Sequence, residues 1–290
     1  LSHSSAASDV YKRQGMPGIN RQSKDVLIET ISQDLSLGLS AHMIFPVMSD
    51  SEKDHEGTKA ADDGMPLQSA VRELKEKFGD EILLMTDACL CTSTDHGHCG
   101  LLEGHNILND LSVEKLVGIA LSHARAGTDY VCLSDMMDGR VLSVRRSFEN
   151  EGFKSTGIMS YSVKYASSFY GPFREAASSS PSFGDRSSHQ MDVRSDYREA
   201  ILEARADVDE GCDISMVKPG LPYLDVLSEV SSSIERPVAV YNVSGEYSMV
   251  MGYAKDPVQR KRVVLEILGS FSRAGADIIV SYHSREAVRE

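Results

Sequence analysis

The sequence has no tryptophan, few other aromatic residues and a deficit of positive charge. Its 290 residues include 30 Lys and Arg against 43 Asp and Glu, a formal net charge of -13. Because phosphate backbones are bound by concentrated basic surfaces, this balance argues against a nucleic-acid partner. No apolar run approaches the roughly 18 residues of a membrane-spanning helix, and no charged segment followed by an apolar one resembles a secretory signal. We therefore expect neither nucleic-acid nor membrane association.

Cysteine is also sparse, but its distribution is informative. Three of the five cysteines, Cys89, Cys91 and Cys99, lie within eleven residues of one another. Clustered cysteines indicate metal binding or catalysis in a reducing compartment rather than a disulfide framework. We therefore expect a cytoplasmic protein, or one of an organelle matrix, and interpret Cys132 and Cys212 as core thiols.

Apolar segments with strand-like and helical periodicity alternate along most of the chain. Strands are predicted over residues 41–47, 82–88, 130–134, 157–161, 214–217, 237–242 and 277–282. Strands that alternate with helices pair in parallel through right-handed crossovers. No strand is followed by a glycine-rich phosphate loop, which favours a (β/α)₈ TIM barrel over a doubly wound sheet. The eighth strand is expected before Met16.

Several segments have more specific predictions. Residues 1–14 show neither periodicity and are interpreted as a mobile arm or a non-native segment, which leaves one barrel domain over 15–290. Residues 165–192 are predicted to form a long irregular loop that acts as an active-site lid. Ser112 is predicted to cap one helix, and Asp196 is predicted to open another that buries Tyr197.

Polar side chains stand where several predicted strands end. These residues are Asp87, Ser134, Lys218, Asn242 and Tyr282. In a TIM barrel, the carboxyl ends of all the strands meet at the face that carries the active site. We therefore expect these side chains to converge on one pocket.

The spacing Cys-x-Cys-x₇-Cys formed by Cys89, Cys91 and Cys99 is typical of a thiolate metal site, with zinc the first choice. Three sulfur ligands leave one coordination position for water or substrate, as in catalytic zinc sites. The alternative is that the cysteines are small buried hydrophobic residues. His96 and His98 are interpreted as structural residues or as support for the ligands.

Lys218 ends an apolar strand, and Lys164 lies just past the end of another. A lysine in a partly apolar barrel mouth has a lowered pKa, so its free amine can attack a carbonyl. If the two converge, each ammonium lowers the pKa of the other; alternatively, both are ordinary surface lysines. Arg174 and Arg186 could hold a substrate carboxylate, or could be solvated loop charges.

Taken together, these segments resemble the porphobilinogen synthase (5-aminolaevulinate dehydratase) family. The resemblance runs from Met16 almost to the last residue. It is carried by Asp87-Ala-Cys-Leu-Cys91 with His96-Gly-His-Cys-Gly100, Ser134-Asp-Met-Met-Asp-Gly-Arg140, Met159 to Arg174, Phe183-Gly-Asp-Arg186, Met216-Val-Lys-Pro-Gly220 and Val243-Ser-Gly-Glu-Tyr247.

The resemblance implies a TIM barrel that condenses two molecules of 5-aminolaevulinate into porphobilinogen, with loss of two waters, in tetrapyrrole synthesis. Lys218 would form a Schiff base with one substrate, and Lys164 would engage the other. Asp87 and Ser134 match residues around the two amines. The cysteines match the zinc-dependent variety of the family, and Glu203 matches a position that binds an activating Mg²⁺ away from the active site.

The resemblance also implies substrate contacts and an assembly. Those contacts would come from Tyr170, Phe173, Arg174, Arg186, Gln190, Ser244 and Tyr282. The family forms homo-octamers through an N-terminal arm, and both that arm and the first barrel strand are expected to be missing here. Two alternatives remain at this point: an aldolase-type Schiff-base lyase, which would not need the cysteines, and a zinc-binding but catalytically silent interaction protein.

Overall fold

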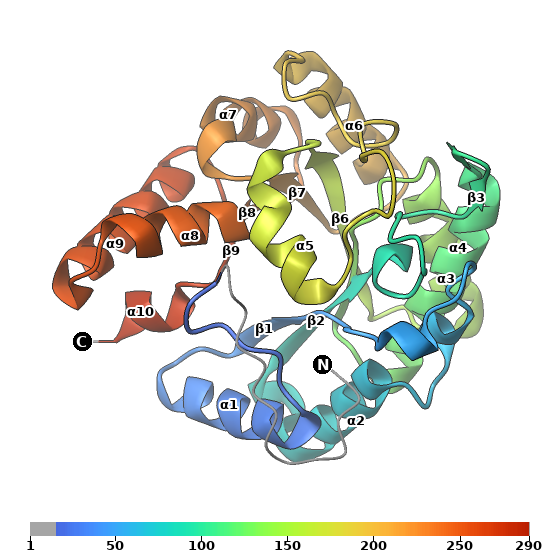
Figure 1. Ribbon diagram of the computed structural model, residues 1–290, viewed down its shortest axis with the longest axis horizontal. Helices are drawn as coiled ribbons and strands as arrows, with labels where there is room; N and C mark the ends of the chain where they lie inside the picture. Colours follow the sequence, from blue (N-terminus) through green and yellow to red (C-terminus); the bar gives the residue numbers. More distant parts are fainter. Residues whose placement is uncertain (1–15, 290) are drawn as a thin grey trace.

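The computed structural model describes residues 16–289, so the prediction for residues 1–14 lies outside the described residues. A seven-stranded parallel sheet curls into a nearly closed barrel at the centre of the molecule (Figure 1). Its strands, in spatial order, are β1 (Ala41–Ile44), β2 (Leu83–Ala88), β5 (Tyr130–Leu133), β6 (Gly157–Lys164), β7 (Ile214–Lys218), β8 (Val238–Asn242) and β9 (Ile278–Ser281). The predicted TIM-type architecture is confirmed.

Helices surround this sheet on the outside (Figure 1). They are α1 (Lys24–Ser36), α2 (Pro66–Phe78), α3 (Asn109–Ala126), α4 (Arg140–Glu151), α6 (Tyr197–Asp209), α7 (Leu224–Ser233) and α9 (Pro257–Arg273). The short helices α5 (Gly171–Ala177), α8 (Ser244–Tyr253) and α10 (Ser284–Val288) and a small hairpin of β3 (Leu102–Glu103) and β4 (Asn106–Ile107) complete the fold. No helix within residues 16–289 is both long and apolar enough to span a membrane.

Helix α2 illustrates how sequence determines these elements. Pro66 occupies its first turn, where no amide donor is needed, and Gly79 ends it with a φ of 51°, which a residue with a Cβ rarely adopts. Between them, Leu67, Val71 and Leu74 recur at helical spacing and are buried. They pack in one apolar cluster with residues of β1 and β2, which anchors the helix to the sheet.

Strand β6 carries a β-bulge that matters for the site. Ser160 pairs with Ser215 of β7, whereas Val163 pairs with Val217, so β6 has one residue more than its partner over this interval. Beyond the bulge, Lys164 and Lys218 are register partners. The two lysines therefore leave the sheet side by side at its carboxyl edge.

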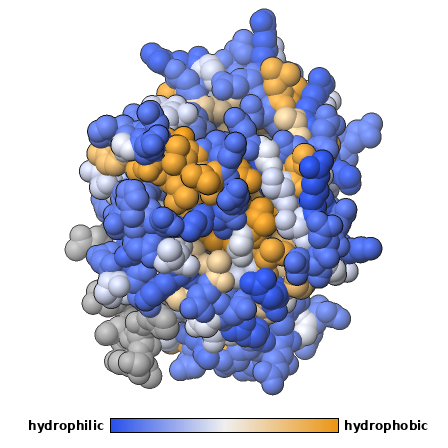
Figure 2. Space-filling model, turned by 90° about the vertical axis from the view of Figure 1, so that its right-hand side faces the viewer, coloured by the Kyte–Doolittle hydropathy of each residue, from blue (hydrophilic) through white to orange (hydrophobic). Residues whose placement is uncertain are grey.

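The surface is dominated by polar side chains, as the net charge of -13 leads one to expect. The face in Figure 2 is mostly hydrophilic, with hydrophobic residues gathered in smaller areas between the charged ones. At the end of the described chain, Arg285 of α10 donates to Asp34 of α1 at 2.5 Å and to the Thr30 carbonyl at 3.2 Å. This contact joins helices from opposite ends of the sequence (Figure 1).

Four local predictions were wrong. The strand predicted over 41–47 ends at Ile44. Ser112 lies inside α3 and is not its cap, because its hydroxyl donates to the Leu108 carbonyl one turn back. Tyr197 is 44% exposed, since it begins α6 on the solvent side. Residues 165–192 are not wholly irregular, because they contain α5 and a preceding 3₁₀ turn.

Candidate active site

A cavity opens at the carboxyl ends of the barrel strands. Its space, part of it open to solvent, is about 510 Å³. The lining brings together most of the residues predicted as a site, from segments far apart in the chain: Phe45, Asp87, Cys91, Thr92, Ser134, Lys164, Tyr170, Phe173, Arg174, Arg186, Lys218, Tyr241, Val243, Ser244 and Tyr282.

Lys218 is enclosed by aromatic rings. Its Nζ lies 4.3 Å from the ring centre of Tyr241, 4.9 Å from that of Tyr161 and 5.2 Å from that of Tyr170. The pKa of Lys218 is lowered to about 7, chiefly by burial and also by the neighbouring ammonium of Lys164, against the opposing effect of Asp87. A large fraction of this amine is therefore free at neutral pH, which is what a nucleophile requires.

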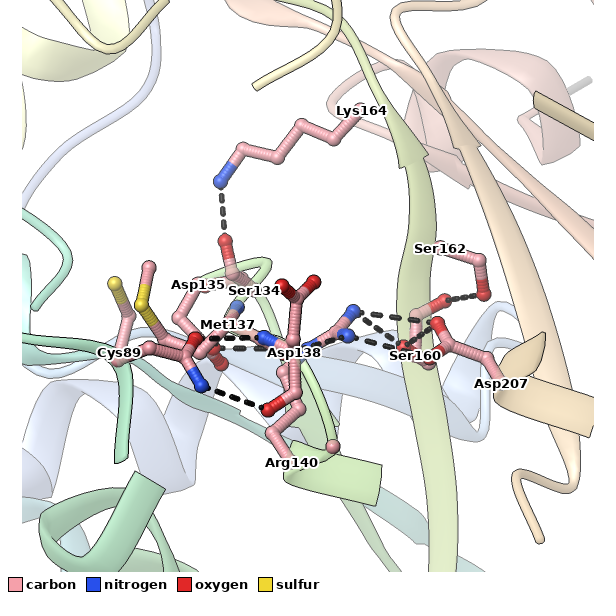
Figure 3. A network of polar contacts seen from close by, with 12 residues as sticks. Cys89, Ser134, Asp135, Met137, Asp138, Arg140, Ser160, Ser162, Lys164 and Asp207 are labelled. Atoms are coloured by element: carbon pink, nitrogen blue, oxygen red, sulfur yellow. Dashed lines mark hydrogen bonds and ion pairs between the residues drawn. The ribbon is translucent and has the colours of Figure 1, made fainter. Parts of the chain in front are cut away.

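Lys164 is held beside it by a different contact. The side chain is 5% exposed, and its Nζ donates a hydrogen bond to the backbone carbonyl of Ser134 (Figure 3). Its ammonium also lies 5.7 Å from the ring centre of Tyr161, which the two lysines share.

Asp87 is the buried carboxyl of this cavity. Burial raises its pKa, while the charge of Lys218, a hydrogen bond from Ser134 and the charge of Lys164 act in the opposite direction. A carboxyl whose pKa is raised by burial is suited to take part in proton transfer.

The three clustered cysteines converge beside the cavity, and Cys91 is one of its lining residues. Cys89 follows β2, Cys91 lies in the 3₁₀ turn Leu90–Thr92, and Cys99 comes from the loop beyond it. All three are buried, and their sulfur atoms lie within 4.8 Å of one another. Hydrogen bonds from the thiols of Cys89 and Cys91 hold the pKa of Cys99 well below its usual range. A trio that stabilises a thiolate in this way fits a thiophilic cation such as zinc.

The segment predicted as a lid contributes two arginines to the cavity lining. Arg174 of α5 lies over the ring of Tyr170 at 5.5 Å, and burial lowers its pKa, as does the charge of Arg186. Arg186 is 6% exposed and donates to the carbonyls of Gly97 and Ser179 at 2.9 and 2.5 Å. Among residues 16–289, the Nε atoms of both arginines have no hydrogen-bond partner, so donors remain for an anionic group.

Gln190 lies behind these arginines, and its backbone amide donates to the Arg186 carbonyl at 2.9 Å. The side chain is 3% exposed, yet neither of its polar atoms has a partner within the described residues. Buried amides normally form hydrogen bonds, so this pair of unsatisfied atoms is suited to a bound ligand. Gln190 itself is not among the described residues that line the cavity.

Ser244 and Tyr282 also line the cavity. Ser244, the first residue of α8, accepts a hydrogen bond from the Phe173 amide at 3.0 Å. The hydroxyls of Tyr282 and Tyr241 lie 3.0 Å apart. The cavity lining thus offers hydroxyl groups as well as guanidinium groups.

Glu203 lies away from this cavity, half-buried on the outer helix α6. Burial raises its pKa, as do the neighbouring carboxylates of Asp207 and Asp138. The structure does not bring Glu203 together with the lysines.

A buried ionic network escaped prediction (Figure 3). The guanidinium of Arg140 bonds to both carboxylate oxygens of Asp207 at 3.2 and 3.3 Å and lies 3.6 Å from Asp135. The hydroxyl of Ser160 donates to Asp207 at 2.6 Å. The network fixes the loop whose Ser134 carbonyl holds the Lys164 ammonium. Arg140 stands in one of the motifs quoted above, but no sequence spacing indicates its partner on α6.

The aromatic enclosure of Lys218 was also missed. Tyr161 and Tyr241 are indistinguishable from ordinary strand residues in the sequence. The inward orientation of these two tyrosines could have been inferred from strand alternation. Their common contact with Lys218 could not, because they lie on different strands.

Comparison with known proteins assigns the family. A family model described as delta-aminolevulinic acid dehydratase matches residues 4–290. The Bacillus subtilis delta-aminolevulinic acid dehydratase is 46% identical over 275 residues, which cover 94% of this chain and 84% of that protein. The Methanothermobacter thermautotrophicus relative is 48% identical over 274 residues, with 94% and 82% covered.

A solved structure agrees. The delta-aminolevulinic acid dehydratase (porphobilinogen synthase) of Toxoplasma gondii, in complex with the reaction product porphobilinogen, superposes with a TM-score of 0.95 at 42% identity. The match covers 99% of this chain and 82% of that one. The resemblance inferred from the motifs is confirmed, and the aldolase-type and catalytically silent alternatives are set aside. The chain belongs to the delta-aminolevulinic acid dehydratase family, the porphobilinogen synthases of tetrapyrrole biosynthesis.

Proposed function

We propose that Lys218 and Lys164 divide the two 5-aminolaevulinate molecules of the condensation between them. One observation carries this proposal: the two lysines are register partners on β6 and β7 and open into the same cavity. Two amines held side by side can each bind one ketone, which places the two substrates in contact.

Lys218 supplies the first nucleophile. Its free amine attacks the ketone carbon of one substrate, the carbonyl oxygen leaves as water, and a carbon–nitrogen double bond forms. Asp87 is suited to protonate the departing oxygen, because burial raises the pKa of its carboxyl. The protonated imine then withdraws electrons from the adjacent carbon.

Lys164 forms a Schiff base with the second substrate in the same way. This step releases the second of the two waters that the reaction loses. Loss of a C–H proton beside the imine carbon of one substrate supplies the electron pair that attacks the imine carbon of the other, whose C=N pair moves to the lysine nitrogen. The amino group of that other substrate then closes the ring on the remaining imine carbon, both lysine amines leave, and loss of protons from the ring carbons gives the pyrrole. Ser134 assists by holding Lys164 through its carbonyl and by donating a hydrogen bond to Asp87.

The ends of the cavity bind the substrate carboxylates. Arg174, Arg186 and Gln190 have unsatisfied buried polar atoms, which suit the carboxylate of one substrate. Ser244 and Tyr282 offer hydroxyl groups to the other. Tyr170 and Phe173 enclose the chains between these two ends.

Cys89, Cys91 and Cys99 would hold zinc, with the fourth position left to the second substrate or to water. When bound there, zinc supplies a Lewis acid that polarises an oxygen of the substrate or of the leaving water. The clustered sulfur atoms and the low pKa of Cys99 support this assignment.

Two further properties are proposed chiefly from the resemblance. Glu203 is proposed to bind Mg²⁺ outside the active site, and the neighbouring carboxylates of Asp207 and Asp138 support a cation there. A homo-octamer stays a prediction, and sedimentation analysis of the full chain tests it.

Borohydride reduction in the presence of 5-aminolaevulinate tests the lysine assignment. Mass spectrometry of the zinc-loaded protein should find an adduct on Lys218, and replacement of Lys218 by Ala should abolish it. Lys154→Ala is the matched control, because Lys154 is an exposed lysine in the turn before the amino end of β6, whereas Lys164 stands at the carboxyl end of that strand. A folded, zinc-loaded sample without an adduct on Lys218 contradicts the proposal.

A further inference from the structure

A second group of metal-binding side chains lies beside the cysteine loop. His55, Asp95 and His96 each offer one ligand atom, and these atoms lie within 4.8 Å of one another. The Nδ1 atom of His55 is 3.6 Å from an Asp95 carboxylate oxygen, and the rings of His55 and His96 are 5.0 Å apart between centres. The cysteine site uses none of these residues.

The backbone holds the two contributing loops together. His55 comes from the turn that precedes the 3₁₀ helix Thr58–Ala61, and the other two residues follow the turn that contains Cys91. Asp54 and Thr94 form a parallel bridge, and the Asp95 amide donates to the Asp54 carbonyl at 3.0 Å. The loops are therefore fixed before any ligand binds.

We propose that His55, Asp95 and His96 form a second divalent metal site, suited to a borderline transition cation such as zinc. Two imidazoles and one carboxylate are a frequent protein donor set for zinc, and water molecules can complete the coordination. The site is independent of the chemistry assigned to the lysines.

The present hydrogen bonds predict that this site is weaker than the cysteine site. The Nε2 atom of His96 lies 3.2 Å from the His55 carbonyl, and its Nδ1 accepts from the His98 amide at 3.1 Å. A cation bound through Nε2 replaces the hydrogen bond to the His55 carbonyl. The ring proton then moves to Nδ1, so Nδ1 can no longer accept from the His98 amide. The side chains of His55 and Asp95 are also 63% and 55% exposed, so water competes with them.

The same loop is the place where the lid docks. The His96 carbonyl accepts from the Ser182 amide at 2.9 Å, and the Gly97 carbonyl accepts from Arg186 at 2.9 Å. The lid lies so close that a Cβ on Gly97 would stand 2.4 Å from the Ser180 carbonyl oxygen. A cation that fixes His96 therefore favours the docked lid.

Metal stoichiometry tests the site. Equilibrium dialysis of the full chain against zinc should give one bound equivalent more in the unmodified protein than in His55→Ala or Asp95→Asn. His105→Ala is the matched control, because His105 is another exposed histidine beside the lid, where it packs against Phe183, and it should keep both equivalents. Equal stoichiometry and affinity in His55→Ala and the unmodified protein would overturn the proposal.

Cobalt substitution shows which of the two metal sites is lost in His55→Ala. Cobalt on thiolates gives an intense charge-transfer absorption that imidazole and carboxylate ligands do not give. That absorption should be retained in His55→Ala, and its loss there would overturn the proposal, because the missing equivalent would then belong to the cysteines. With both sites intact, a second equivalent of zinc should slow tryptic cleavage at Arg186, and this protection should be absent in His55→Ala.

Discussion

The low pKa of Lys218 makes a prediction about how fast this lysine is trapped at different pH values. Its pKa falls from 10.5 to about 7, chiefly because burial disfavours the ammonium form. About half of the amine is then free at pH 7, against roughly one part in three thousand for an ordinary lysine. The difference corresponds to a preference of about 5 kcal/mol for the neutral form.

The assay is the initial rate of borohydride trapping of 5-aminolaevulinate on Lys218 between pH 5.5 and pH 9.5. The free amine is the reactive form, so the rate should rise with pH through about 7 and level off above. In Lys164→Gln the neighbouring positive charge is gone, so the midpoint should move to higher pH. Lys154→Ala should leave the midpoint in place.

Two results would refute this reasoning. A midpoint at pH 9 or above in the unmodified protein would mean that burial does not free the amine. A midpoint that moves to lower pH in Lys164→Gln would mean that the coupling between the two lysines has the opposite sign.

The remaining predictions concern the metal, the ionic network and the packing behind Lys218. Cys99→Ser should lower both zinc content and activity by at least about tenfold. Cys212→Ala removes a buried thiol outside the trio and should retain both. Metal analysis combined with an activity assay distinguishes these outcomes. Arg140→Met leaves two carboxylates without their cation and should cost about 3–5 kcal/mol of unfolding free energy in urea titration, against less than about 0.5 kcal/mol for the exposed Arg146→Ala. Gly220→Ala places a Cβ 2.5 Å from the ring of Phe271 and should cost about 1–3 kcal/mol, visible as a lower Tm; an unchanged Tm would show that the ring moves aside freely.

The sequence was sufficient for the residues that stand at strand ends. Asp87, Lys164 and Lys218 could be placed together because parallel strands finish at one face of a barrel, whatever the details of the helices. The cysteine trio could be recognised because its members are close in sequence. Both inferences depend on local pattern and on one general property of the fold.

Contacts between distant segments could not be obtained in the same way. Arg140 pairs with Asp207 across 67 positions, and no periodicity connects them. Helix α8 was missed because Val243 to Tyr247 reads equally well as a turn, and the helix is stabilised by the Glu246 carboxylate accepting from the Val243 amide and from the Asn242 side chain. The sequence predicts a buried Tyr197, because no sequence pattern distinguishes an exposed aromatic residue at the start of a helix from a buried one.

The single extra residue in β6 has a consequence for which mutations this enzyme can tolerate. Before the bulge, Met159 and Tyr161 face the barrel interior, and after it Val163 packs outward against Ala200, so Lys164 faces inward only because the alternation is reset. Deletion of Ser162 would give a regular strand in which Val163 still packs outward and Lys164 still faces the cavity opposite Lys218. The extra residue therefore sets the local bend and twist of β6 beside the two lysines, and its removal is expected to straighten the strand while every site residue keeps its orientation.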